Sequence, residues 1–416
     1  MSSVLPFDII AQIIETIGEN NDTDLLKKLA LVSHSFHQIC SKHLFATVEL
    51  YEVDRDRRVA PPLKGFVKLL KSRPEVVKYI RKLTYNLQLL PLCSYPLASF
   101  NYEDRLLSSI VPNLLRTISH LNRLTITASQ LDWKTLDSSL TSALLYLMQL
   151  PTINHIDLSY IQDFPLSSFV PSVNLHRLDI SCLRHFDGPE EEVSSEIVVL
   201  SEMMPKIRQF HTSASPLLTT KLLHAKKQDG QPAFDFTDLI RLSTCLEDET
   251  NLRYLLQNAK SLEKLHLSVG RTQSLVRLSE ILSSSSRTLK ALDFSVSVYN
   301  WEPLSLAGLC EGLEAIAGHN MLESLSFDVL VDEQESEDFV GSEVQEVEKV
   351  LVKPGWSSLK QVSFKVTISC WGGSAKLCKA LVQSLPDKYL SQISKLESVA
   401  FDFSVAIDKC IVGSSD

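Results

Sequence analysis

Four residues near the start of the chain are of types that bind zinc. His34, His37, Cys40 and His43 follow one another at every third position, and imidazole and thiolate groups are common ligands of tetrahedral zinc. On a helix, each step of three residues turns back by about 60°, so the four side chains spread around the axis instead of converging on one ion. The spacing therefore predicts no metal site, with Cys40 half-buried and the histidines solvated.

Catalytic motifs are absent from the sequence. None of GxxxxGK[ST], GxGxxG, HExxH or GxSxG occurs, and no cysteine and histidine are arranged as nucleophile and base. Triads assembled only in three dimensions leave no such signature. The eight cysteines contain no CxxC pair, and a chain of this length can bury a core without disulfides, so we expect reduced thiols. The sequence predicts a protein that is not an enzyme and needs no cofactor.

The composition is that of a folded, acidic chain. The 416 residues are 44% hydrophobic, and 41 basic against 50 acidic residues give a net charge of −9, which argues against binding nucleic acid by neutralising phosphates. No uncharged apolar run approaches the roughly 20 residues that span a bilayer. The first fifteen residues lack the basic start of a signal peptide and carry Asp8 in their apolar stretch. We expect a cytoplasmic or nuclear protein, or both, without membrane or nucleic-acid partners.

The first fifty residues contain signals for three short helices. Pro6 suits the first turn of a helix, and Gly18 is typical of the residue that ends one. Asp22 or Thr23 is expected to cap a second helix and Ser33 a third. Five isoleucines give the first helix a broad apolar face: Ile9, Ile10, Ile13, Ile14 and Ile17. A module this small buries little by itself, so an exposed apolar face implies a partner.

Residues 4–48 combine short motifs at a characteristic spacing. They read Leu5-Pro6-x-Asp8-Ile9-Ile10, then Ile13 and Ile17, then Leu29-x-Leu31-Val32-Ser33-x-x-Phe36, Cys40 and Leu44-Phe45. This combination resembles an F-box, although Asp8 stands where the family often has Glu and Phe36 where many members have Trp. The resemblance implies docking on the Skp-type adaptor of SCF-type cullin-RING ubiquitin ligases, and through the adaptor on cullin. The residues that it assigns to the adaptor contact are Leu5, Pro6, Ile9, Ile13, Leu29, Val32 and Phe36.

A basic segment follows the N-terminal module of residues 1–50. Residues 51–82 hold ten basic residues against four acidic ones. Residues 55–62 are typical of a connector, and residues 63–72 of an amphipathic helix. No aromatic or base-reading constellation accompanies the charge, so a solvated helix face is favoured over nucleic-acid binding. We assign residues 51–79 to a basic connector and helix.

From residue 80 onward one short pattern recurs, apolar-x-x-apolar-x-apolar, with helix-period segments between its copies. The copies begin at Ile80, Leu121, Ile153, Leu175, Ile207, Leu239, Leu262, Leu289, Leu322, Leu359 and Leu396, and those at Ile207 and Leu239 are weaker. A strand and a helix of this size cannot bury both apolar faces alone. Successive units must therefore stack, with the strands in a parallel sheet and the helices outside, which predicts an α/β fold.

This arrangement resembles a leucine-rich-repeat solenoid with parallel strands on its concave face. We expect about 10–11 units over residues 80–416. The copies lie 22 to 41 residues apart, and the ninth position of the units lacks the Asn or Cys that the family uses to bond the turn. An irregular, degenerate solenoid is therefore expected, with turns satisfied in another way. The order of F-box, basic helix and divergent repeats resembles the large fungal F-box families.

Side chains between the leucines of each strand point to the opposite, concave face. One column across the strands is mostly basic. This column predicts a surface that binds acidic groups of a substrate protein. Its candidate binding residues are Arg123, His155, Arg177, Arg241 and Lys264. The neighbouring column includes Asp157, Asp179 and Asp293. The competing interpretation is that arginines and aspartates of adjacent strands pair with one another and keep the sheet soluble.

Two functions are compatible with these features. The first is a substrate-recognition subunit of an SCF-type ubiquitin ligase, whose repeats hold an unknown protein substrate near a recruited ubiquitin-transfer enzyme. The second is a leucine-rich-repeat scaffold without a ubiquitin-ligase role, whose N-terminal helices cap the first repeat. The two differ in burial, because a cap packs its isoleucine face on residues 63–85 and a docking module leaves that face open.

Overall fold

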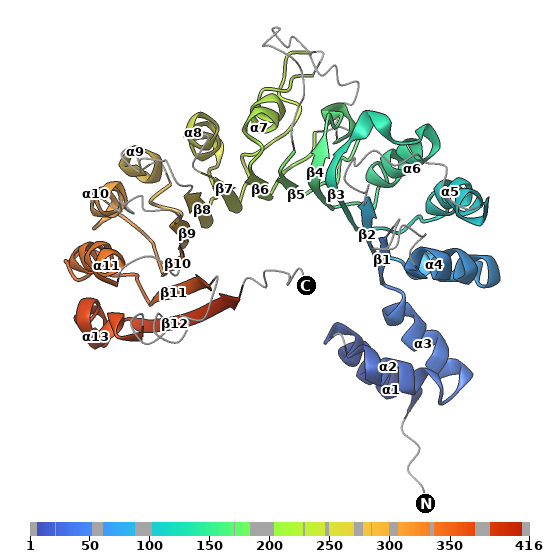
Figure 1. The fold of residues 1–416 in the computed structure, drawn as a ribbon, viewed down its shortest axis with the longest axis horizontal. Coiled ribbons are helices and arrows are strands. Elements are labelled where there is room, and N and C mark those ends of the chain that lie inside the picture. The colour runs from blue at the N-terminus through green and yellow to red at the C-terminus, as the bar shows by residue number, and fades with distance from the viewer. Residues whose placement is uncertain are drawn as a thin grey trace, which may run out of the picture. The chain divides into compact units, whose positions relative to one another are not determined.

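Helices and parallel strands alternate along the chain (Figure 1). The computed structural model describes residues 6–409 apart from 21, 52–60, 88–101, 170, 184–203, 228, 246–248, 270–277, 284, 299–306, 333–336 and 371–382. The chain divides into two compact units, Met1–Lys206 with Lys221–Phe234, and Ile207–Thr220 with Asp235–Asp416. Within the described residues, no helix combines the length and the apolar character needed to cross a membrane.

Three short helices open the first unit: α1 (Phe7–Glu19), α2 (Thr23–Ala30) and α3 (His34–Leu44). The Asp22 carboxylate accepts the amide of Leu25 at 3.1 Å, and the Ser33 hydroxyl accepts the amide of Phe36 at 3.3 Å. These bonds confirm a cap at Ser33 and select Asp22 over Thr23. Buried residues from each helix form a common core, namely Ile14, Leu26 and Cys40.

Gly18 does not end the first helix, although its residue type predicted that it would. The prediction that it ends the first helix is wrong, because α1 continues to Glu19 and Asn20 is its C-cap. Gly18 lies instead where α3 approaches α1, and a Cβ atom built on it would overlap the imidazole ring of His43. The missing side chain therefore permits close helix packing rather than a left-handed turn.

The strands of the first unit are parallel neighbours in chain order. Its elements after α3 are β1 (Thr47–Tyr51), α4 (Pro61–Ser72), η1 (Pro74–Tyr79), β2 (Lys82–Leu87), α5 (Tyr102–Leu115), β3 (Arg123–Asp132), η3 (Trp133–Thr135), α6 (Ser138–Met148), β4 (His155–Gln162), η4 (Leu166–Phe169) and β5 (Arg177–Ser181). The sheet thus begins before Ile80. Its first strand was missed, although Phe45, Val48 and Leu50 carry the same apolar pattern as the later copies.

The second unit continues the alternation with parallel strands in chain order. It contains β6 (Gln209–Ser213), β7 (Arg241–Cys245), α8 (Glu249–Asn258), β8 (Lys264–Val269), α9 (Leu278–Ser283), β9 (Ala291–Val298), α10 (Ala307–Ile316), β10 (Ser324–Asp332), α11 (Glu337–Leu351), β11 (Gln361–Cys370), α13 (Leu385–Tyr389), η5 (Ile393–Lys395) and β12 (Ala400–Lys409), and α7 (Pro216–Leu223) begins in it. The weaker pattern copies at Ile207 and Leu239 both lead into strands. Two of the helix-period segments that the sequence places between the pattern copies, residues 193–204 and 375–385, lie outside the described residues except at positions 204 and 383–385.

The repeated apolar positions form the core of each unit. Leu124, Ile156 and Leu178 are fully buried in the first unit. Figure 1 shows the helices of this unit along one side of its strands. In the second unit, phenylalanines of successive strands stack, with ring centroids 5.7 Å apart for Phe294 and Phe327 and 4.4 Å apart for Phe327 and Phe364. Strand register thus fixes the core contacts, because equivalent residues meet on adjacent strands.

A repeated backbone arrangement joins most neighbouring strands within each unit. The carbonyl of Asn122 accepts two amides at the start of the following strand, from Asn154 at 3.0 Å and His155 at 3.1 Å. Carbonyls that act in the same way in the second unit are those of Arg208, Ile240, Glu263, Lys290 and Glu323. Main-chain bonds therefore align the strands without the Asn or Cys side chain that the units lack.

Candidate functional site

The inner faces of the three N-terminal helices pack against one another and form a core. On α1, Ile10, Ile14 and Ile17 recur at intervals of four and three residues, so they lie on one helix face. Ile14 is 1% exposed, and Ile10 and Ile17 pack against the cluster that it forms with Leu26 and Cys40. Phe7, Ile9 and Ile13 of α1 are exposed and are not among the residues that form or pack against this cluster.

Exposed apolar side chains concentrate on these helices. Of the ten large hydrophobic residues that are exposed among the described residues, six lie between positions 7 and 32. We call these six the apolar surface: Phe7, Ile9, Ile13, Leu25, Leu31 and Val32. Leu31 and Val32, in the turn between α2 and α3, are 87% and 64% exposed. Such a concentration is typical of a surface that binds another molecule.

The predicted adaptor-contact residues divide into three groups. Pro6, Ile9, Ile13 and Val32 are exposed. Leu29 and Phe36 are half-buried and pack against the helical core, so they support the surface more than they form it. Leu5 lies outside the described residues. Sequence reasoning missed three members of the apolar surface, Phe7, Leu25 and Leu31, although their apolar character in so short a stretch was a visible signal.

The first strand–helix unit meets the N-terminal helices through α3. This helix contacts η1, and the Arg73 guanidinium lies 2.7 Å from Nε2 of His37. Backbone bonds continue the connection, since the Ala46 carbonyl accepts the amides of Arg81 and Lys82 at 2.9 Å. These contacts attach the helices while leaving the six residues of the apolar surface exposed.

The two predicted columns of polar side chains are present on the strands of the first unit. Arg123, His155 and Arg177 are register partners across β3, β4 and β5. One step along the same face, Thr125, Asp157 and Asp179 are partners in turn. Basic and acidic columns therefore lie side by side, which allows ion pairs between them.

Those ion pairs form. His155 Nε2 lies 3.0 Å and Arg177 Nη2 2.8 Å from the carboxylate of Asp179, and Arg123 Nη2 lies 3.4 Å from that of Asp157. The side chains of His155 and Asp179 are each only 10% exposed. In the first unit, therefore, the interpretation of mutual pairing describes Arg123, His155 and Arg177 better than the expectation of open cations.

The pKa values of the two aspartates are shifted in opposite directions. Burial alone would raise the pKa of Asp179, but hydrogen bonds from His155 and Arg177 outweigh it and hold that pKa below its ordinary value. Burial, together with repulsion from Asp179, raises the pKa of Asp157, because Arg123 compensates it only in part. Oxygen and nitrogen atoms of His155, Asp157 and Asp179 lie within 4.8 Å of one another, close enough to surround a cation. Arginine guanidinium groups already occupy the neighbourhood of both carboxylates.

The polar face of the second unit differs in how its basic residues are paired. Arg241 on β7 and Lys264 on β8 are register partners and both are exposed. In the next row, Ser243 faces His266 on β8, and the Ser243 hydroxyl lies 2.8 Å from Nδ1 of His211. No carboxylate of the described residues lies within 4 Å of either cation. The expected basic surface is therefore retained at these two positions.

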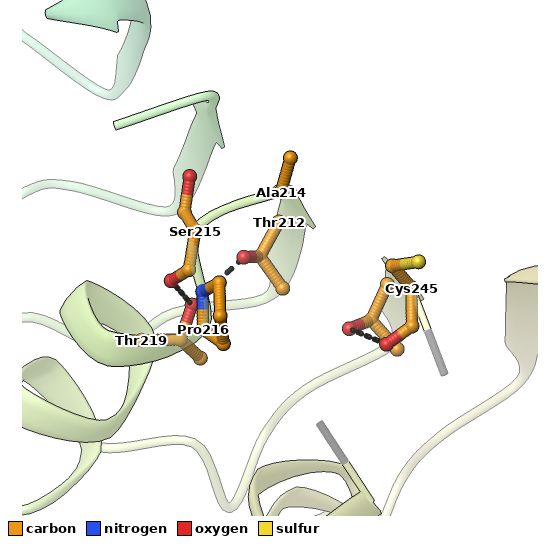
Figure 2. Close-up of a pocket in the computed structure, with 7 residues that line it drawn as sticks. Thr212, Ala214, Ser215, Pro216, Thr219 and Cys245 are labelled. Carbon is orange, nitrogen blue, oxygen red and sulfur yellow. Dashed lines mark hydrogen bonds between the residues drawn. The ribbon is translucent and has the colours of Figure 1, made fainter. Parts of the chain in front are cut away.

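A small pocket lies beside this face, at the end of β6 and the start of α7 (Figure 2). It is lined by Thr212, Ala214, Ser215, Pro216, Thr219, Thr244 and Cys245 and holds about 10 Å³, room for at most a single water molecule. The hydroxyls of Thr212 and Thr219 lie 2.8 Å apart, and Thr219 also donates to the Ser215 carbonyl. Its size and these internal bonds indicate a structural role.

Comparison with known proteins adds no family. No protein-family model matches the chain, and no curated protein is significantly similar to it in sequence.

Proposed function

We propose that this protein is a substrate-recognition subunit of an SCF-type cullin-RING ubiquitin ligase. In this proposal residues 4–48 act as an F-box that docks on a Skp-type adaptor, and the strand–helix units form a divergent leucine-rich-repeat solenoid that holds a substrate protein in the cytoplasm or nucleus. The observation that carries the proposal is the apolar surface. Six large apolar side chains stay exposed on helices whose own core does not need them.

Adaptor binding would follow from burial of this surface. Complete burial of a large apolar side chain contributes about 1.5–3 kcal/mol, so side chains that are already half covered contribute about half of that each. Several such contributions are needed to offset the loss of freedom on association. Leu29 and Phe36 would act indirectly by holding α2 and α3 on the core. The chain itself would supply proximity between substrate and ubiquitin-transfer enzyme, with no chemistry of its own.

The proposal is tested with a matched pair of substitutions. Ile13 and Met321 are each 50% exposed, but only Ile13 belongs to the apolar surface. Full-length Ile13→Asp is expected to lose co-purification with a Skp-type adaptor, because a carboxylate would be buried at the interface. Met321→Asp is expected to retain it. Circular dichroism should show both variants folded.

Retention of the adaptor by folded Ile13→Asp would overturn the proposal, and so would equal loss from both variants. A second pair, Val32→Asp on the same surface and Leu217→Asp on α7, repeats the comparison on exposed residues. It keeps the test decisive if the change at Ile13 disturbs α1.

The alternative function is a scaffold whose N-terminal helices cap the solenoid. The contact between α3 and η1, with Arg73 2.7 Å from His37, favours it because a cap needs this attachment. A scaffold would bind no adaptor even with its apolar surface intact. The wild-type co-purification therefore separates the two functions before any variant is made.

A further inference from the structure

The polar faces of the two units differ at one recurrent position. In the first unit, Arg177 is followed two residues later on β5 by Asp179, and the two side chains pair at 2.8 Å. In the second unit, the residue two positions after Arg241 is Ser243, and the residue two positions after Lys264 is His266. Where β5 of the first unit has a carboxylate, β7 and β8 of the second unit have a hydroxyl and an imidazole.

The geometry of β7 and β8 brings these groups together. Leu242 and Leu265 are buried at 2% and 0% exposure, so Arg241 and Lys264 extend from the opposite face of their strands. The strands are paired in register and neighbouring strands lie about 4.8 Å apart. One anionic group can therefore contact both cations. Ser243 and His266 lie one row further along, about 7 Å away at two residues of strand rise.

The acidic side chains of Asp293 and Glu263 do not form ion pairs with Arg241 or Lys264. Asp293 on β9 is the register partner of His266 and lies half-buried. It interacts with Lys264 and His266, without ion-pair contact to Lys264 among the described residues. Glu263, which precedes Lys264, is engaged 2.7 Å from Lys290. Arg241 and Lys264 consequently offer positive charge that the described part of the unit does not satisfy.

We propose that Arg241 and Lys264 form an anion-binding site for a peptide segment of the substrate, with Ser243 and His266 as adjacent hydrogen-bonding groups. The ligand chemistry is a carboxylate or a phosphoryl group on an extended acidic segment. The inference deepens the proposed function, because this segment would belong to the protein that the repeats hold. It assigns no such role to Arg123, His155 and Arg177, whose charge is used internally.

The test measures peptide binding to the full-length protein alone, by fluorescence anisotropy. Three labelled peptides of equal length carry several glutamates, several phosphoserines, or glutamine and serine at the same positions. The glutamate peptide, the phosphoserine peptide or both are expected to bind, and the neutral peptide is not. Binding should weaken from about 0.05 M to about 0.5 M salt, because salt screens exposed charges. The two acidic peptides distinguish a carboxylate ligand from a phosphoryl ligand.

Variants then locate the site. The pair Arg241→Glu and Lys264→Glu is expected to raise Kd at least about tenfold, since both contacts become repulsive. The control pair Lys260→Glu and Arg287→Glu makes the same charge change at exposed positions before β8 and β9, and should leave Kd within about twofold. The pair Arg241→Ala and Lys264→Ala, expected to weaken binding several-fold, replaces the first pair if charge reversal impairs folding.

Two results would overturn the site: failure of the wild type to bind either acidic peptide, and equal weakening by the control pair. Because the adaptor is absent from this measurement, its outcome is independent of adaptor docking. A protein that binds acidic peptide but no adaptor would keep the anion site and lose the ubiquitin-ligase role.

Discussion

On the polar strand face of the first unit, two aspartates determine whether the neighbouring basic side chains are free to bind a ligand. Asp179 is bound by His155 and Arg177, whereas Asp157 has only the longer contact to Arg123. Both carboxylates are substantially buried. The two residues can therefore be compared directly. The cost of burying the carboxylate is largely offset by hydrogen bonds at Asp179 and only partly offset at Asp157.

We predict opposite consequences for Asp179→Asn and Asp157→Asn. A depressed pKa in the folded state means that Asp179 stabilises the protein above the unfolded pKa, and that this stability is lost as pH falls through the lower folded value. Asp179→Asn should therefore cost about 1–3 kcal/mol at neutral pH. Its difference from wild type should narrow as pH falls below the unfolded pKa and Asp179 becomes protonated.

For Asp157 the sign is reversed. A raised folded pKa means that stability declines as pH rises from the unfolded pKa through the folded one. Asp157→Asn removes this decline, so at neutral pH it should be as stable as wild type or more stable by up to about 1 kcal/mol. Urea unfolding at several pH values measures both variants. Equal loss of stability at neutral pH would contradict the assignment of the two aspartates.

Elements at the end of the chain are joined by one buried carboxylate. Glu348 on α11 is 3% exposed and accepts the amides of Gln392 at 2.7 Å and Ile393 at 3.0 Å. These amides begin η5, which has no earlier turn to bond them. The side chain thus attaches the segment that leads into β12 to the helix beside it.

We predict that Glu348→Ala loosens this segment. The amides of Gln392 and of the buried Ile393 would lose their acceptor, at a cost of about 1–3 kcal/mol. Hydrogen exchange of residues 390–409 should accelerate, while exchange of β7 and β8 should not change. The control is Glu346→Ala, which removes an exposed carboxylate paired with Lys349 on the same helix. Similar exchange in both variants would show that the bonds from Glu348 do not hold η5.

In both units, strands that follow one another in the sequence also pair with one another. Each described strand within a unit pairs with the strand before or after it, and the stacked rings of Phe294, Phe327 and Phe364 extend this rule to the core. Arrays of this kind derive stability from contacts between adjacent repeats. A local defect is therefore expected to weaken the nearest units most.

We predict such a gradient for Phe327→Leu. The change removes ring contacts to both neighbours and should cost about 1–2 kcal/mol. Hydrogen exchange should accelerate most in β9, β10 and β11, less in β7, and least in β2 to β4 of the other unit. Uniform acceleration along the chain would contradict stability by neighbouring contacts.

Most elements of this fold were predictable from local pattern. The periodicity of a short strand or helix indicates which of its faces is buried, so the copies from Ile80 onward were predicted. The cap at Ser33 was predicted too, and that of the second helix was narrowed to Asp22 or Thr23. Polar columns could be written down for the same reason, because register follows from the repeated leucines. The resemblance of residues 4–48 to an F-box also came from sequence, and it remains a proposal.

Tertiary structure decided which of these side chains are available. Whether His155 is paired, or Leu29 and Phe36 are covered, depends on residues distant along the chain and on the positions of their side-chain atoms. Gly18 shows the same dependence, because the imidazole of His43 on α3 occupies the space that a side chain at position 18 would need. Periodicity reports which way a residue faces, but exposure and charge pairing are properties of the packed surroundings. Arg241, Lys264 and part of the apolar surface were candidates from sequence, but only the folded chain shows that they are exposed.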